Sequence, residues 1–170
     1  MLAGAAVFSD FILAIHILGV VVGFGAVFAF PMLFAAAVRA DPVMIPWLLR
    51  ARQRVGRYLV NPGLLVVVLA GIYLASDEHQ WSKFYVGWGI IAAVVVGAIE
   101  GSFIVRPAGR LAAMAERDLA ASAVPAGGQR TSATWSTEYT AALRRFTLAG
   151  NLMALIVVVT IFLMATHAGA

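Results

Sequence analysis

Residues 58–105 read YLVNPGLLVVVLAGIYLASDEHQWSKFYVGWGIIAAVVVGAIEGSFIV, two apolar runs joined by the short polar link Asp77-Glu78-His79-Gln80. A helix needs about 20 apolar residues to cross the hydrocarbon of a bilayer, and both runs are long enough. So short a link forces the two helices into an antiparallel hairpin. We therefore predict transmembrane helices over 58–76 and 81–105, the second stopped by Arg106 and Pro107, because proline disfavours helix in the residue before it.

Two further apolar runs flank this hairpin, at residues 8–38 and 146–166. The chain of 170 residues is 62% hydrophobic and 12% charged, and a soluble protein of this size could not hide so much apolar surface. The predicted fold is all-α: an integral membrane four-helix bundle in which residues 1–170 form a single transmembrane domain.

The two longer connections differ in character. In residues 42–57 apolar side chains recur at helical spacing among arginines, which predicts an interfacial helix leading into the second span. Residues 121–134 are rich in Ala, Ser and Gly, and this composition predicts a flexible tract.

Basic residues set the predicted orientation, because Lys and Arg near spans are retained in the cytoplasm. The side with the long connections carries Arg39, Arg50, Arg52, Arg54, Arg57, Arg106, Arg110, Arg117, Arg130, Arg144 and Arg145, whereas the opposite side carries Lys83. We expect a multi-pass protein of the bacterial cytoplasmic (inner) membrane with both termini outside. The arginines lie beside apolar runs, which favours the lipid bilayer as their partner and no nucleic acid.

His16 is an ionisable residue inside the first span, and such residues tend to face the bundle interior or a cavity. Gly19 and Gly23 lie on the same helical face and form a groove beside the imidazole. The groove suits a neighbouring helix, and it equally suits the edge of a flat macrocycle such as haem b. His16 is therefore either a hydrogen bonder across a tight helix contact or a cofactor ligand.

His79 and His167 are expected on the same outer side of the membrane as His16. Neutral imidazoles bind haem iron, copper and zinc, so the three histidines are candidate metal ligands. The alternative is that histidines in a link and at a helix end are solvated. The chain has no cysteine, which excludes disulfides, thiolate metal sites and thiol catalysis.

Glu100 lies near the cytoplasmic end of the third span. A carboxylate there is neutralised or paired with a cation. The candidate cations on that side are Arg57, Arg106, Arg144 and Arg145. Glu100 is then either half of a structural ion pair, for which we single out Arg144 and Arg145, or a proton-relay carboxylate.

The segment Ala14-Ile-His16-Ile-Leu-Gly19-Val-Val-Val-Gly23-Phe-Gly25 resembles the first helix of several small bacterial membrane families. The resemblance continues through Arg57-Tyr58-Leu-Val-Asn-Pro62-Gly63 and reaches Trp88, covering about residues 10–110. The chain looks most like a family of predicted four-helix integral membrane proteins of unknown function. It is also similar to the HemJ-type protoporphyrinogen oxidases and the CopD-type copper-resistance proteins.

The HemJ-type resemblance implies that His16 is a haem ligand, because that family associates a first-helix histidine and a third-helix lysine with haem and activity. The sequence departs from this pattern at two places. The only lysine near the third span is Lys83 at its very start, and Gly23-Phe24-Gly25 replaces the usual Trp-Phe-Gly/Ala element.

Three functional hypotheses remain. The first is a haem- or metal-linked redox or accessory protein that uses His16. The second is a non-catalytic subunit, in a homo-oligomer or a larger membrane complex, that assembles through its GxxxG faces. The third is a small-solute or proton transporter that uses Glu100. Whether the chain is an enzyme is left open.

Overall fold

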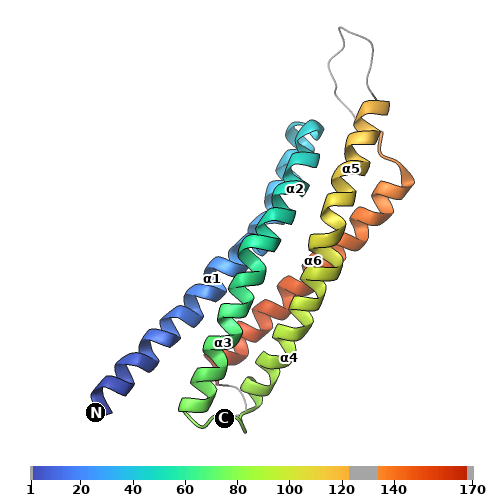
Figure 1. The fold of residues 1–170 in the computed structure, drawn as a ribbon. Helices are drawn as coiled ribbons and strands as arrows, with labels where there is room; N and C mark the ends of the chain where they lie inside the picture. Colours follow the sequence, from blue (N-terminus) through green and yellow to red (C-terminus); the bar gives the residue numbers. More distant parts are fainter. Residues whose placement is uncertain (1, 123–133, 168–170) are drawn as a thin grey trace.

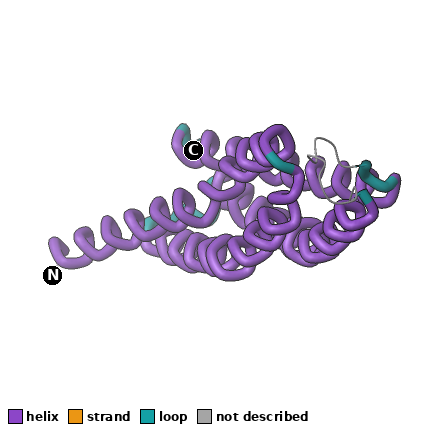
Figure 2. The backbone as a smooth tube through the Cα atoms, turned by 90° about the horizontal axis from the view of Figure 1, so that it is seen from above, coloured by secondary structure: helices purple, strands orange, loops and turns teal. Residues whose placement is uncertain are grey.

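The computed structural model describes residues 2–122 and 134–167, which are almost entirely helical (Figures 1 and 2). The predicted flexible tract falls mostly on residues 123–133 and lies outside the described residues. The elements in chain order are α1 (Leu2–Ala40), the 3-10 turn η1 (Pro42–Met44), α2 (Ile45–Val55), the π-helical turn η2 (Gly56–Val60), α3 (Asn61–Asp77), α4 (Phe84–Ile99), the π-helical turn η3 (Glu100–Val105), α5 (Arg106–Ala121) and α6 (Thr137–Ala165).

Among the described residues, four continuous helical rods are long and apolar enough to cross a membrane: Val7–Ala40, Pro42–Asp77, Phe84–Ala121 and Thr137–Ala165. In the most apolar window of each rod, at most 28% of the residues are buried inside the protein. The other residues in these windows are partly or fully exposed, as they are where lipid is the surrounding solvent. The predicted all-helical fold with four membrane-spanning candidates is confirmed.

The second and third rods continue beyond the spans that the sequence predicted. Helix α2 continues through η2 into α3, and the third span continues through η3 into α5 instead of stopping at Arg106 and Pro107 (Figure 1). Pro62 and Pro107 each stand at the start of the helix that follows a π-helical turn. Proline lacks an N–H and its ring collides with a carbonyl one turn earlier, and a wider π-helical turn accommodates both defects.

The rods are arranged as two antiparallel pairs. Helix α1 lies along α3, and α4 lies along α6, with smaller contacts between α3 and α4 and between α1 and α6. At one end, hereafter the basic end, α2 and α5 continue the rods of α3 and α4 and lie against each other (Figure 1). The two pairs are therefore joined most extensively at the basic end.

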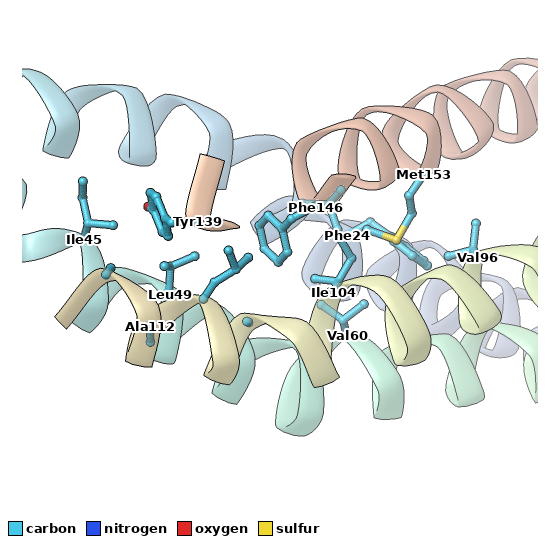
Figure 3. Packing of buried hydrophobic residues seen from close by; sticks show 14 of the residues in the cluster. Phe24, Ile45, Leu49, Val60, Val96, Ile104, Ala112, Tyr139, Phe146 and Met153 are labelled. Atoms are coloured by element: carbon cyan, nitrogen blue, oxygen red, sulfur yellow. The ribbon is translucent and has the colours of Figure 1, made fainter. Parts of the chain in front are cut away.

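A buried cluster fills the basic end and the middle of the bundle. Figure 3 shows Ile45 and Leu49 of α2 near Tyr139 of α6, and Val60 of η2 near Ile104 of η3. Tyr139 is 1% exposed and is stacked on Trp135 with ring centroids 4.7 Å apart, so its ring serves as packing.

Asp118 ties the start of α6 to α5. Its Oδ2 accepts hydrogen bonds from the backbone N–H of Ser136 at 2.9 Å and from the Ser136 hydroxyl at 2.7 Å. Both bonds favour the charged carboxylate. Ser136 in turn caps α6 by accepting from the Tyr139 N–H. The helix predicted to begin at 146 therefore begins at Thr137.

Gly63 and Gly23 bring α1 and α3 into contact. A Cβ built on Gly63 lies 2.9 Å from the Cα of Gly23, which is backbone and cannot turn aside. We expect Gly63→Ala to lower the free energy of unfolding by about 1–3 kcal/mol, the usual cost of overpacking. Unfolding by SDS in mixed micelles, followed by circular dichroism, measures it. The matched control is Gly25→Ala, whose Cβ meets nothing within 4 Å. Equal effects of the two substitutions would contradict the close contact between Gly63 and Gly23.

Candidate functional site: a buried ion pair at two π-helical turns

Arg52 of α2 and Glu100 at the start of η3 form a bidentate ion pair. The Arg52 Nη1 and Nη2 atoms donate to the two Glu100 carboxylate oxygens, each at 2.8 Å. Arg52 is 4% exposed and Glu100 is 0% exposed. Two parallel hydrogen bonds between charged groups are the strongest form of this contact, and here water is excluded from it.

Gly56 makes the approach of these two groups possible. A Cβ at this position would lie 2.5 Å from the Glu100 Oε1 atom, 2.6 Å from a Val105 methyl carbon and 3.0 Å from the Arg52 Nη1 atom. Gly56 is the first residue of η2, and Glu100 is the first residue of η3. The pair is thus enclosed where two π-helical turns from different rods face each other.

Aromatic rings cover the pair from the side of α1 and α6. The Arg52 guanidinium carbon lies 5.9 Å from the ring centroid of Phe30, within cation–π range. Phe30 meets Phe146 of α6 edge to face, with centroids 6.1 Å apart. On the side of η3, the Gln53 side-chain amide donates to the Val105 carbonyl at 3.1 Å. Phe30 of α1 therefore contacts the pair directly, and Phe146 of α6 packs against Phe30.

The position of the pair in the fold gives it a bridging role. Arg52 belongs to the rod that contains α3, and Glu100 belongs to the rod that contains α4. The pair therefore links the α1–α3 pair of helices to the α4–α6 pair. Burying two charges costs desolvation energy that their attraction often only just offsets, so such a pair adds little to the stability of the fold. π-Helical turns also occur frequently at functional sites.

The partner of Glu100 differs from the predicted set. The ion pair is made by Arg52, whereas Arg144 and Arg145, which we singled out from the sequence, are exposed on α6. Arg57 and Arg106 are exposed as well. Arg52 was missed because the sequence suggested an interfacial helix over 42–57. In the structure α2 lies against α5 and directs Arg52 inward.

His16 is half-buried against α3. Its Nδ1 atom lies 2.9 Å from the carbonyl oxygen of Val67, and a Cβ on Gly71 would lie 3.2 Å from its Cε1 atom. A carbonyl only accepts, so this bond requires the proton on Nδ1 and, in the neutral ring, leaves the lone pair on Nε2. The structure thus contains the hydrogen bond across a tight helix contact that was one of the two interpretations of His16.

The glycine groove beside His16 is filled by α3. A Cβ on Gly19 would lie 2.9 Å from a Val67 methyl carbon, and one on Gly23 would lie 3.4 Å from the Cα of Gly63. Of the two occupants that the groove suits, a neighbouring helix and the edge of a macrocycle, the first is therefore present in this conformation. Gly97 of α4 also packs against α3, since a Cβ built on it would lie 3.1 Å from the Leu64 side chain. These glycine faces are used for contacts within the chain.

His79 and His167 lie at the end of the bundle opposite the basic end, where residues 78–83 join α3 to α4. His79 is exposed in the turn after α3, and the His167 ring meets Tyr85 edge to face with centroids 5.4 Å apart. Within residues 2–122 and 134–167, no group of three His, Asp or Glu side chains is placed to hold a metal ion. The structure therefore does not bring the three histidines together as a ligand set in the described residues.

The Arg52–Glu100 pair is the candidate site on which a functional proposal has to rest. Compared with protein-family models, with curated proteins and with solved structures, the chain matches none of them.

Proposed function

We propose that this protein is a proton-coupled transporter of a small solute, with Glu100 as the proton-binding group and Arg52 as its internal counter-charge. The observation that carries the proposal is the wholly buried bidentate pair at two facing π-helical turns. An ionisable residue inside a membrane bundle is expensive and is a functional candidate for that reason.

The proposed cycle exchanges one partner of Glu100 for another. In the described conformation the carboxylate holds Arg52. In the second conformation the carboxylate holds a proton, and the Arg52 side chain turns along α2 toward water at the basic end. The carboxylate is thus neutralised in both conformations, by the guanidinium in one and by the proton in the other. Because the pair links the two helix pairs, this exchange allows them to move relative to each other.

No second ionisable group competes with Arg52 for Glu100 among the described residues. The described elements around the pair present Phe30 from α1, Phe146 from α6 and Gly56 from η2, none of which titrates. The other described ion pairs lie at the basic end: Arg50–Glu116 and Arg117–Glu138 are exposed, and Arg117 also reaches the buried Asp118. Each turn of the proposed cycle therefore binds and releases one proton at Glu100.

The proposal includes an orientation, with the basic end in the cytoplasm of a bacterium and both termini outside. It is supported by the clustering of arginines at that end. Protons then reach Glu100 from the cytoplasmic side when Arg52 turns away. Labelling a tag at the C-terminus from outside intact cells checks the orientation, and a tag wholly protected from the reagent contradicts it.

Proteoliposomes with a trapped pH dye test the proposed transport. The protein is reconstituted, and a proton gradient is imposed with a panel of small organic cations and anions on one side. We expect proton movement in the wild type with at least one solute and none in Glu100→Gln. The matched control is Glu116→Gln, an exposed carboxylate paired with Arg50, which should behave as the wild type. No movement in the wild type, or undiminished movement in Glu100→Gln, contradicts the proposal.

One observation favours a second candidate, a haem- or metal-linked redox function at His16. Metal-binding histidines commonly donate one ring N–H to a backbone carbonyl, which orients the other nitrogen toward the metal. The contact of His16 Nδ1 with the Val67 carbonyl leaves Nε2 available in this way. The visible spectrum of the purified protein tests it: a Soret band lost in His16→Ala supports this function, and a colourless, metal-free protein excludes it.

A further inference from the structure

The arginines at the basic end fall into two groups. Arg50, Arg52 and Arg117 are in ion pairs with carboxylates. Seven others are exposed, and no described carboxylate pairs with them. One is Arg39, at the end of α1. The other six belong to the remaining three rods, and we call them the arginine girdle: Arg54, Arg57, Arg106, Arg110, Arg144 and Arg145. The girdle is thus a set of unneutralised cations drawn from three of the four rods.

The girdle arginines lie at similar depths in the three rods. Arg57 precedes the end of α3 by about 20 residues, or about 30 Å at 1.5 Å per residue. Arg145 precedes the end of α6 by the same distance, about 30 Å. Arg106 follows the start of α4 by about 33 Å. Since the hydrocarbon core of a bilayer is about 30 Å thick, the girdle lies at the level of the lipid headgroups.

Large exposed apolar side chains lie next to the girdle, on the side of the hydrocarbon core. Tyr58 is 72% exposed, Phe103 is 55% exposed and Leu148 is 58% exposed, and each lies one to three residues from a girdle arginine in the direction of the span. The exposed apolar side chains match the acyl chains of a phospholipid, and the guanidinium groups next to them match its headgroup.

The spacing within the girdle suits phosphate. Arg54 and Arg57 are three residues apart, and Arg106 and Arg110 are four apart, so each set presents two guanidinium groups on one helix face. Guanidinium groups bind phosphate oxygens through paired N–H donors. We infer that the girdle binds the phosphate groups of anionic phospholipids and retains these lipids around the basic end in preference to zwitterionic ones.

Native mass spectrometry of the full chain tests this inference. The protein is released from micelles doped with equal amounts of phosphatidylglycerol and phosphatidylcholine, so that membrane orientation plays no part. We expect about tenfold preferential retention of phosphatidylglycerol, an effect of the size that one or two arginines produce at an anionic surface. The preference should disappear when all six girdle arginines are replaced by Gln and should largely persist when they are replaced by Lys.

Two controls keep the outcome decisive. Circular dichroism verifies that the six-fold Gln variant folds, which is expected because all six side chains are exposed. Lys83→Gln, at the opposite end of the bundle, should leave the preference unchanged. Equal retention of the two lipids by the wild type would overturn the inference. Competition with soluble anions gives a second such result. If inorganic phosphate displaced the lipid more than chloride did at equal ionic strength, the girdle would be a site for a soluble anion, and the inference would be overturned.

Discussion

Glu100→Gln is expected to lower the free energy of unfolding by about 3–5 kcal/mol, the cost of leaving one partner of a buried ion pair without its counter-charge. The Arg52 guanidinium is 4% exposed and has both of its bonds to the Glu100 carboxylate. The neutral amide of Gln can accept one of these bonds but cannot balance the charge. SDS unfolding in mixed micelles measures the change.

A double substitution separates the pair from its surroundings. Arg52→Met with Glu100→Leu removes both charges and keeps apolar volume, and such replacements of buried pairs are often neutral or stabilising. We expect the double variant to recover most of the stability that Glu100→Gln loses, while it remains inactive in the proteoliposome assay. A double variant less stable than Glu100→Gln would show that the two side chains do not act as a pair.

Gly56→Ala is the second substitution with a large expected effect. The new methyl group would overlap the Glu100 Oε1 atom and a Val105 methyl carbon, at 2.5 Å and 2.6 Å. Helix propensity alone would favour alanine by about 1 kcal/mol, so a net loss has to come from this overlap. We expect a net loss of about 1–3 kcal/mol and a weakened Arg52–Glu100 pair.

Gly101→Ala is the matched control for Gly56→Ala. It lies in η3, next to Glu100 in the chain, and its Cβ would meet nothing within 4 Å. This variant should unfold at the same or a higher SDS fraction than the wild type. A Gly56→Ala protein as stable as Gly101→Ala would mean that the two π-helical turns are not in close contact.

The four spans were predictable because their signal is local and redundant. Each depends on a long apolar run, and the short link at residues 77–80 determines the hairpin. The helix ends were less predictable, since Pro107 ends a regular α-helix in the usual case. Pro62 and Pro107 did carry information: a proline within a long apolar run favours a local break in the helical hydrogen-bond ladder, and in this protein both prolines follow π-helical turns.

The partner of Glu100 was not predictable from spacing. Arg52 is 48 residues from Glu100, and their meeting depends on α2 lying against α5, which only tertiary packing determines. For His16 the sequence indicated a groove but left two occupants open, a neighbouring helix and the edge of a macrocycle, and the structure has α3 in that groove. Its Val67 partner is a backbone carbonyl, which the sequence cannot specify.

Distance measurements between spin labels test most directly whether the Arg52–Glu100 pair holds the two helix pairs together. The chain has no cysteine, so labels at Ile17→Cys of α1 and Phe162→Cys of α6, both exposed positions, are unambiguous. Because the neutral amide of Gln stands in for the protonated carboxyl, we predict that Glu100→Gln shifts the distance distribution and that Glu116→Gln, at an exposed carboxylate, leaves it unchanged. Distributions that are the same with and without Glu100→Gln would contradict this prediction.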